Sequence, residues 1–229
     1  MIAEQLPKFD MKFTDHIEEE QSPEFKERMK DVVGACIENM SKEHVALGEG
    51  KAAEVYYRNA DSISCVKFNI NDEISPNNVE EEMALMDILY EKGVRVPEPI
   101  GVARGKYSML IMERLIASSL DDFIRGVSQT DLPDNFDVDV FFDKCEDEME
   151  KMHSFGIHHR DLHLGNIMID IEGNPIFIDF GDAKKVFLSD DDPYKDDTIK
   201  GMVRYTSDKE RLRNSKIEFK MFLSNSNKA

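Results

Sequence analysis

The sequence has few cysteines and no long apolar run. Its three cysteines, Cys36, Cys65 and Cys145, are widely spaced, odd in number and form no Cys-x-x-Cys pair. Such a set is typical of buried, reduced thiols, so we expect a cytoplasmic protein without disulfides. No apolar stretch reaches the length that spans a bilayer, and the early Glu4 makes the amino terminus unlike a signal peptide. We therefore expect a soluble, intracellular chain.

Basic residues are also scarce relative to acidic ones. Lysine and arginine number 29 against 47 aspartates and glutamates, which gives a formal net charge of -18. Nonspecific binding to nucleic acid or to anionic membranes needs a basic surface, so we expect neither as a partner. The acidity would suit a basic protein partner but does not require one. A hydrophobic share of 41% in 229 residues supports one large domain or two small lobes with a true core.

The most informative stretch, residues 158–181, reads HHRDLHLGNIMIDIEGNPIFIDFG. Two runs rich in β-branched residues flank the turn formers Glu-Gly-Asn-Pro, a pattern that predicts a β-hairpin. The hairpin would bring Asn166, which precedes it, beside Asp179, which follows it. Two oxygen ligands placed in this way suit Mg²⁺ together with phosphate oxygens. Asp161 lies just before the hairpin and is available to meet an attacking hydroxyl.

The pattern HRD-L-x-x-x-N followed by I-D-F-G resembles the protein-kinase-like superfamily, and the resemblance runs from about Val45 to Gly181. It implies an α+β, bilobal fold with a β-rich small lobe and a shortened helical large lobe. It also implies phosphotransfer with ATP and Mg²⁺, with Asp161 as the base and Asn166 and Asp179 as metal ligands. The expected boundaries are 1–43 for an N-terminal arm and amphipathic helix, 44–115 for the small lobe up to the hinge, and 116–229 for the reduced large lobe.

The segment VALGEGKAAEVYY, residues 45–57, reads as strand, glycine turn and strand. Glycines let a backbone approach phosphates closely, although a lone Gly-x-Gly pair is also common in ordinary hairpin turns. The segment resembles the kinase glycine-rich loop, with Ala53 in place of the third glycine. By this resemblance, the nucleotide-binding residues of the loop are Gly48, Glu49, Gly50, Lys51, Ala53 and Val55.

A lysine within the next strand, Lys67 in SISCVKF, resembles the kinase lysine that grips the α- and β-phosphates. That lysine needs a carboxylate partner, and the predicted helix VEEEMALMDILY offers Glu80, Glu81 and Glu82. Counting back from Gly93 to the place where the resembling families carry their helix glutamate favours Glu82. Glu81 remains an alternative.

The run MLIMERL, residues 109–115, predicts a buried strand that ends in a polar turn, the expected hinge. By resemblance, Met112 would sit at the back of the nucleotide pocket. The backbone of Glu113 and Leu115 would hydrogen-bond adenine.

Helical signals lie on both sides of this central part. Ser22-Pro23-Glu24 predicts a helix start with Ser22 as the N-cap, and apolar residues then recur at helical spacing up to Met40. We expect this helix to pack on the small lobe, with docking of a partner as the alternative. A second helix is predicted over 138–153, and its inward positions are Val140, Phe141, Cys145, Met149 and Met152.

The chain after Gly181 is acidic at first and then locally basic. Asp196 or Asp197 would begin a final helix and brace from below the catalytic loop, HRDLHLGN of residues 159–166. We expect the residues from Asn214 onward to fray. The basic residues would guide an acceptor or form an exposed helix face: Arg204, Lys209, Arg211 and Arg213.

Histidines are concentrated near the catalytic stretch. By resemblance, His159 packs structurally under the loop. No cysteine or carboxylate spacing supports zinc among His153, His158, His159 and His163.

The acceptor is the least determined part of the prediction. Protein kinases commonly carry lysine two positions after the catalytic aspartate, whereas this chain has His163, as small-molecule phosphotransferases of the same fold often do. Arg160 favours instead a protein kinase, and the turn GVRVPEPI resembles that of the compact RIO-type and tRNA-modification-complex-associated kinases. We favour an atypical serine/threonine protein kinase, with a small-molecule kinase and a nucleotide-binding pseudokinase scaffold as alternatives.

Overall fold

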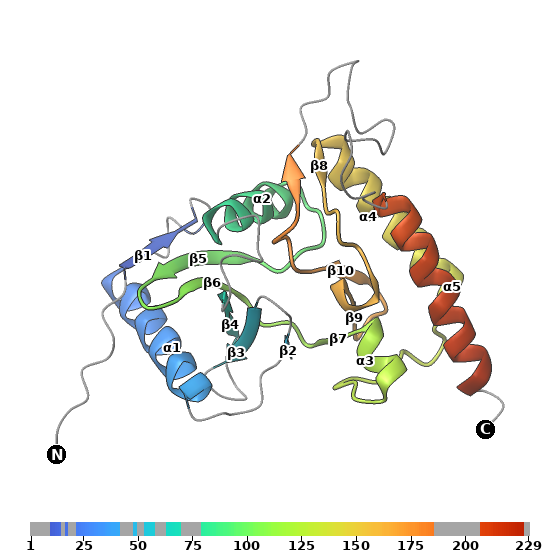
Figure 1. Ribbon diagram of the computed structural model, residues 1–229, viewed down its shortest axis with the longest axis horizontal. Coiled ribbons are helices and arrows are strands. Elements are labelled where there is room, and N and C mark those ends of the chain that lie inside the picture. Colours follow the sequence, from blue (N-terminus) through green and yellow to red (C-terminus); the bar gives the residue numbers. More distant parts are fainter. Residues whose placement is uncertain are drawn as a thin grey trace, which may run out of the picture. The chain divides into compact units, whose positions relative to one another are not determined.

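The computed structural model describes residues 10–14, 17, 22–41, 48–49, 53–57, 63–69, 79–185 and 207–226. The chain forms two compact units (Figure 1). The first unit comprises Met1–Glu91 and Pro97–Leu115, and the second comprises Lys92–Val96 and Ile116–Ala229. Strands and helices occur in both units, which confirms the α+β class expected for a bilobal, kinase-like fold. None of the described helices is both long and apolar enough to cross a membrane.

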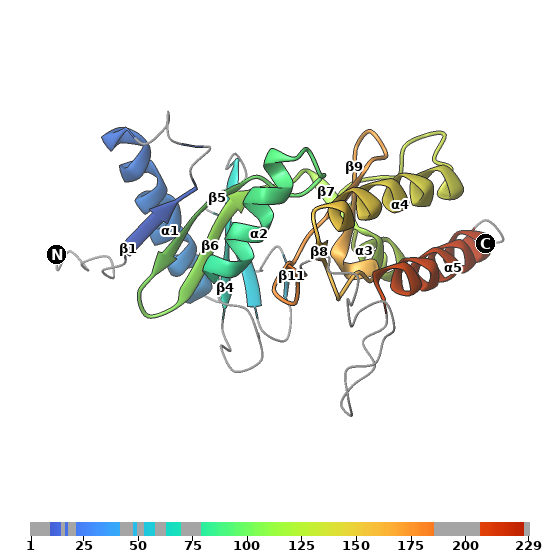
Figure 2. The same ribbon diagram turned by 90° about the horizontal axis from the view of Figure 1, so that it is seen from above.

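The first unit contains an antiparallel sheet of six strands in the order β1-β5-β6-β4-β3-β2 (Figure 1). Strands β1, β5, β6 and β4 are labelled from above in Figure 2. Its strands are β1 Asp10–Phe13, β2 Gly48–Glu49, β3 Ala53–Tyr57, β4 Ser64–Asn69, β5 Pro99–Arg104 and β6 Ser108–Glu113. Strand β4 lies between β3 and β6, where Lys67 stands opposite Val55 on one side and Leu110 on the other. This central position explains why every residue of β4 is buried.

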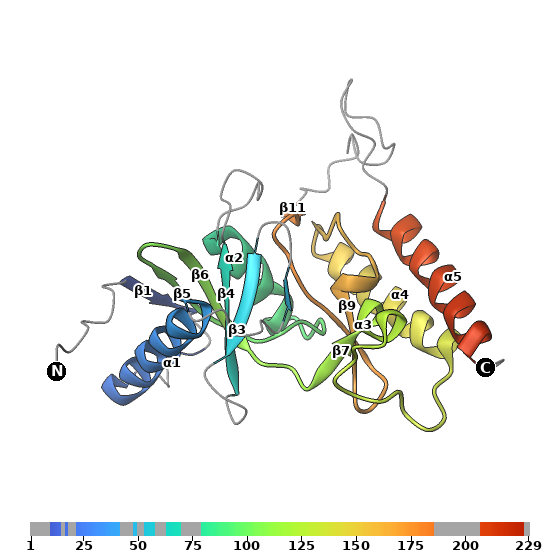
Figure 3. The ribbon, with the colours of Figure 1, turned by 60° about the horizontal axis from the view of Figure 1, so that its bottom comes forward.

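Helices α1, Pro23–Ser41, and α2, Val79–Glu91, contact this sheet (Figure 3). The backbone N–H of Phe25 donates to the Ser22 hydroxyl over 3.1 Å, so helix α1 begins at the predicted N-cap. The apolar stripe of α1 shares one core with Val66 and Phe68 of β4. Successive side chains of a strand point to opposite faces, so Lys67 faces away from this core.

The second unit carries a three-stranded sheet in the order β10-β9-β7 and a small pair, β11 and β8. Its strands are β7 Ala117–Ser119, β8 Ile157–His158, β9 Ile167–Asp170, β10 Pro175–Phe177 and β11 Lys184–Lys185. Its helices are α3 Leu120–Arg125, α4 Val138–Ser154, the short 3-10 helix η2 Leu164–Asn166, and α5 Asp208–Ser226. Strands β9 and β10 pair antiparallel, with Ile169 opposite Pro175, and form the hairpin that the sequence predicts.

Helix α4 differs in one position from its prediction. Val140 was expected to point inward but is 53% exposed, whereas Phe142 is fully buried. Asp137 caps the helix, and its carboxylate accepts the backbone N–H groups of Asp139 and Val140. The helix is rotated so that Phe141 and Phe142 both lie on its buried stripe, and Val140 lies beside that stripe.

Helix α5 corrects two expectations about the end of the chain. It begins at Asp208 and not at Asp196 or Asp197, which lie outside the described residues. It also continues to Ser226, so the segment from Asn214 does not fray within the described part of the chain.

Two kinds of contact hold this last helix on its unit. Phe219 is buried and packs edge-on against Phe123 and Phe136. The ammonium groups of Lys216 and Lys220 reach Asp139 of α4 at 2.9 and 2.7 Å. The helix is largely polar and buries few apolar residues, among them Leu212 and Phe219, which explains why the hydrophobic pattern did not show where the helix begins or how far it extends.

Candidate active site

Lys67 and Glu82 form a buried ion pair within the first unit. The Lys67 Nζ lies 2.7 Å from the Glu82 Oε1, and the two side chains are only 8% and 2% exposed. The neighbouring glutamates face elsewhere, because Glu81 is exposed and Glu80 pairs with Arg104. Of the three glutamates that the sequence offered, Glu82 is therefore the partner of Lys67.

The proposed phosphate loop is described only in part. Strands β2 and β3 pair with Gly48 opposite Val55 and Glu49 opposite Glu54. Gly50 and Lys51 lie outside the described residues. The two strands expected to flank the glycine pattern are thus present and paired. Val55 lies directly across from Lys67.

The expected adenine-binding residues lie at the end of β6. Met112 belongs to this strand, opposite Cys65 and Pro99, and Leu115 is the last residue of the first unit. The backbone N–H of Glu113 donates to the Glu98 carbonyl over 2.9 Å, so this group is engaged within the sheet. An adenine would therefore have to use the Glu113 carbonyl, which the weak donor Cys65 Sγ approaches to 3.5 Å.

Within the second unit, Asp161 lies in a loop between β8 and η2 and has a basic side chain near each carboxylate oxygen. Its Oδ1 accepts the Arg211 guanidinium over 2.9 Å, and its Oδ2 lies 3.4 Å from the His163 Nε2. The Asn166 amide donates to the Asp161 backbone carbonyl over 2.9 Å. The loop therefore presents a half-buried carboxylate whose surroundings are well defined.

These neighbours shift the protonation of both partners. The hydrogen bond from His163 is the main cause that lowers the pKa of Asp161, opposed by burial and aided by the Arg211 charge. The same hydrogen bond raises the pKa of His163 above its ordinary 6.5. Nearby, burial and the charges of Asp161 and Asp179 raise the pKa of Asp182. A lowered pKa keeps Asp161 ionised at neutral pH, as a hydroxyl-orienting base must be.

The hairpin places Asn166 and Asp179 together, as its length suggested. The backbone N–H of Ile178 donates to the Asn166 carbonyl over 3.1 Å, which joins the two ends of the hairpin next to Asp179. Asn166 uses its Nδ2 toward Asp161, so its Oδ1 is the atom that a cation would use. An amide oxygen and a carboxylate are hard donors that suit Mg²⁺.

Two residues of this region have the left-handed backbone conformation that is uncommon outside glycine. Arg160 has φ 67° and Asp179 has φ 63°. Such conformations persist where surrounding contacts over-determine them, and they are concentrated at functional sites. Arg160 directly precedes the predicted base Asp161, and Asp179 is itself the predicted metal ligand.

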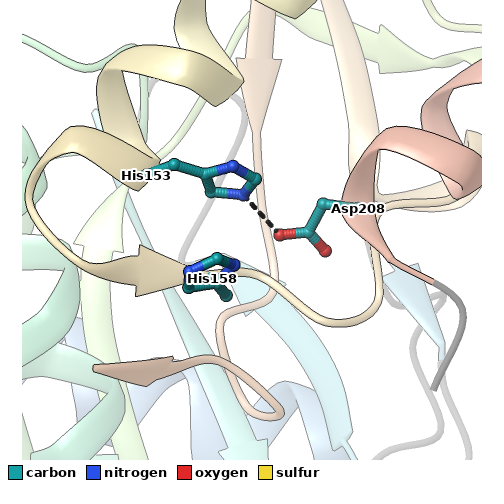
Figure 4. Close-up of side chains that lie close together, drawn as sticks. All are labelled: His153, His158 and Asp208. Carbon is teal, nitrogen blue, oxygen red and sulfur yellow. Dashed lines mark hydrogen bonds and ion pairs between the residues drawn. The ribbon is translucent and has the colours of Figure 1, made fainter. Parts of the chain in front are cut away.

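A buried aspartate that the sequence did not identify holds the catalytic loop. Asp208 is 4% exposed, and its carboxylate accepts the backbone N–H groups of His159 and Arg160 at 2.8 and 2.7 Å. It also bonds the His153 Nε2 at 2.9 Å (Figure 4). The brace predicted for Asp196 or Asp197 is thus provided by Asp208. Ser207-Asp208, a capping serine followed by an acid, is the helix-start signal that could have pointed to it.

His153, His158 and Asp208 also bring possible metal-ligand atoms within 4.8 Å of one another (Figure 4). The two imidazole rings are stacked, with centroids 4.3 Å apart and planes inclined by 24°. Ring nitrogen lone pairs lie in the ring plane, so two nearly parallel rings do not direct both lone pairs at one ion. In this arrangement the trio is a structural brace.

His159 itself is fully buried and belongs to the scaffold. Its Nε2 lies 2.9 Å from the Ile178 carbonyl, and its ring packs on Phe180 with centroids 4.7 Å apart. The contact ties the loop before Asp161 to the segment that carries Asp179.

Comparison with known proteins identifies the same region. The protein kinase domain family matches residues 41–220, which is most of the chain. The chain is 29% identical over 108 residues to a 3-deoxy-D-manno-octulosonic acid kinase of Vibrio parahaemolyticus, covering 46% of this chain and 43% of that protein. A protein of the same name from Vibrio cholerae is 27% identical over 127 residues, covering 54% and 51% of the two chains.

Similarity extends to protein kinases. CBL-interacting protein kinase 8 of Oryza sativa is 27% identical over 160 residues, covering 66% of this chain and 35% of that protein. The chain spans about half the length of the sugar-acid kinases that it matches. Because the family match covers most of the sequence and both sets of relatives are kinases, the chain belongs to the protein kinase domain family.

Proposed function

We propose that the protein is an ATP- and Mg²⁺-dependent phosphotransferase in which Asp161 is the catalytic base. The observation that carries the proposal is the arrangement of the catalytic loop. The side-chain amide of Asn166 donates to the Asp161 backbone carbonyl. The backbone carbonyl of Asn166 accepts the N–H of Ile178, which directly precedes Asp179. The proposed base and the two proposed oxygen ligands thus belong to one connected segment. The buried pair of Lys67 and Glu82 supports the proposal independently, because it holds a cation suited to the α- and β-phosphates.

In the proposed reaction, the acceptor hydroxyl oxygen forms a bond to the γ-phosphorus of ATP. The bond between that phosphorus and the bridging oxygen breaks, ADP leaves, and the hydroxyl proton passes to the Asp161 carboxylate. Asp161 mainly orients the hydroxyl, because the transition state is loose and needs little covalent assistance. Asn166 and Asp179 would hold Mg²⁺, whose charge offsets that of the phosphates.

For the acceptor, we favour serine or threonine in a protein, in a cytoplasmic setting. The family match and the similarity to a plant protein kinase support this choice, and the net charge of -18 suits a basic acceptor. The finer resemblance to RIO-type kinases belongs to the same proposal. It rests on the turn GVRVPEPI, whereas Arg160 favours a protein kinase in general.

A second candidate is a kinase that phosphorylates a small molecule. His163 occupies the place of the protein-kinase lysine and lies 3.4 Å from Asp161. The similarity to proteins named as sugar-acid kinases points the same way. A nucleotide-binding scaffold without activity is the third alternative. It is the least supported, because lysine, glutamate, asparagine and both aspartates are all present.

The test is transfer of labelled γ-phosphate from ATP with Mg²⁺. Wild type, Asp161→Asn and Asp179→Asn would each be given myelin basic protein, 3-deoxy-D-manno-octulosonic acid or an aminoglycoside. We expect label on the protein acceptor with wild type and loss of label in both variants. Label only on a small molecule would select the second candidate. Full transfer by Asp161→Asn would refute the role of the base, and nucleotide binding without transfer to any acceptor would favour the scaffold.

A further inference from the structure

The first turn of α5 contacts three consecutive residues of the catalytic loop. Asp208 accepts the backbone N–H groups of His159 and Arg160, and Arg211 donates to the Asp161 side chain. Residues three apart on a helix lie on the same face, so Asp208 and Arg211 act from one side. One helical turn therefore fixes the loop backbone and, separately, the carboxylate that the loop carries.

Arg211 differs in this respect from the other basic residues of the same turn. Lys209 and Arg213 are exposed, whereas Arg211 is 26% exposed and its guanidinium lies 2.9 Å from the Asp161 Oδ1. The buried residue Leu212, together with Phe219 further along, fixes the rotation of the helix. The basic residues expected to share one role therefore separate into two groups. Arg211 faces the catalytic loop, and Lys209 and Arg213 face solvent.

The two oxygens of Asp161 are held unequally. Oδ1 has the short contact with Arg211, whereas Oδ2 has longer contacts, 3.4 Å each, with His163 and the Asn166 amide. A charge-assisted bond from a guanidinium is strong and directional, and contacts of 3.4 Å are readily exchanged. Oδ2 is therefore the oxygen that an acceptor hydroxyl can reach, and Arg211 determines how it is presented.

Charge makes the guanidinium more than a steric support. Asp161 shares its surroundings with the carboxylates of Asp179 and Asp182 and with the imidazoles of His159 and His163. Like charges gathered in a half-buried site disfavour ionisation of each. The histidines carry charge only when protonated, whereas arginine remains charged at any working pH.

We propose that Arg211 is a positioning residue for the catalytic base: its guanidinium holds Oδ1 of Asp161 so that Oδ2 faces the acceptor hydroxyl. The inference rests on the proposed role of Asp161. It assigns a part in the reaction to the final helix, which lies outside the sequence motif that identified the site. The contact lowers the pKa of Asp161 in the same direction as His163 does, so the positioned carboxylate also stays ionised.

The experiment compares Arg211→Gln, Arg211→Lys and the matched control Arg213→Gln, which removes the same charge from an exposed position of the same helix. Transfer to whichever acceptor the first assay selects, myelin basic protein or 3-deoxy-D-manno-octulosonic acid, would be followed as kcat against pH. For Arg211→Gln we expect kcat to fall by about 10- to 100-fold, the effect of losing one hydrogen bond between charged groups.

The pH profile distinguishes positioning from a purely structural role. Removing the cation raises the pKa of Asp161. The acid limb, the low-pH side of the profile of kcat against pH, should therefore move to higher pH in Arg211→Gln. Arg211→Lys keeps the charge and should return the limb toward wild type, while its kcat stays lower because lysine lacks the planar fork. Arg213→Gln should keep the wild-type acid limb. If Arg211→Gln does not fold, the kcat deficit and acid limb of Arg211→Lys carry the test.

Three results would overturn the inference while the function stands. The first is an Arg211→Gln variant whose kcat and whose pH dependence of kcat are both unchanged. The second is an Arg211→Gln variant whose kcat falls while the acidic side of its pH profile stays in place. The third is a higher kcat in Arg211→Gln, which would make the contact inhibitory. Each requires that Asp161→Asn be inactive in the same assay. Full activity of Asp161→Asn would instead remove the proposed function itself, so the two failures are distinguishable.

Discussion

The Lys67 ammonium and the Glu82 carboxylate are 2.7 Å apart and almost completely shielded from water. They come from the central strand β4 and from helix α2, so their contact ties the helix to the sheet. A buried pair of this kind costs desolvation to form and adds little net stability. Removal of one partner is far more damaging, because it leaves an uncompensated charge in the interior.

Replacement of Glu82 by glutamine should therefore destabilise the fold. We expect the free energy of unfolding to fall by about 3–5 kcal/mol, because Lys67 keeps its charge without a counter-ion. Urea denaturation followed by circular dichroism would measure it. Glu81→Gln, at an exposed position of the same helix, should change stability little. The double variant Lys67→Met, Glu82→Gln should recover part of the loss, and an additive loss would argue against the pairing.

Replacement of Asp208 by alanine should weaken the catalytic loop. The backbone N–H groups of His159 and Arg160 would lose their acceptor, at a cost of about 1–3 kcal/mol for each buried group left unsatisfied. Stability and phosphotransfer should fall together, as measured by urea denaturation and by label transfer. Glu210→Ala, which removes an exposed acid from the same turn, is the control. Equal behaviour of the two variants would refute the brace.

The charge on Asp208 should make the free energy of unfolding depend on pH in the acidic range. Burial works to raise its pKa, but the hydrogen bond from His153 and the adjacent loop lower it overall below 3.8. A carboxylate with a depressed folded pKa contributes stability above its unfolded pKa and loses it as pH falls through the folded one. Urea denaturation at pH values from neutral to below 3.8 should show that the free energy of unfolding falls more steeply with pH in wild type than in Asp208→Asn. Parallel curves would contradict this.

His163 should titrate above its ordinary value of 6.5, because Asp161 stabilises its protonated form. NMR titration of the imidazole would report its pKa directly. In Asp161→Asn the carboxylate charge is absent, so the pKa of His163 should fall toward or below 6.5. The contribution of this pair to stability is present below the unfolded pKa and is lost as pH rises through the folded one. An unchanged pKa in the variant would exclude the contact.

The buried thiols should be inert in the native protein. Cys36, Cys65 and Cys145 are all free and buried, and burial raises the pKa of Cys36 and of Cys65 to about 12. Only the thiolate reacts, so native protein should label slowly with iodoacetamide and urea-unfolded protein rapidly. Rapid labelling of native protein, located by mass spectrometry, would show that a thiol is accessible.

Local sequence patterns predicted the parts of the site that are close together in the chain. The turn formers between Asn166 and Asp179 specified the hairpin, and the count from Gly93 selected Glu82. Both inferences use the fixed geometry of one or two neighbouring elements. Ser22, a capping serine before proline, likewise located the start of α1.

Contacts between distant segments were beyond such patterns. Asp208 lies 49 residues from His159, and Arg211 lies 50 residues from Asp161. No periodicity or spacing connects them, because they meet only when α5 packs on α4. The sequence suggested that an acid would brace the loop, but the choice of Asp196 or Asp197 assumed a helix that began too early.

The bonds from Asp208 make the amides of His159 and Arg160 natural reporters of the last helix. Their hydrogens can exchange with solvent only when Asp208 moves away, so their exchange rates measure how often α5 undocks. We therefore expect the first turn of α5 and the loop to open together. A binding event or truncation that shifted the docking of α5 would change the fraction of molecules whose loop is set for chemistry, without touching a single residue of the motif.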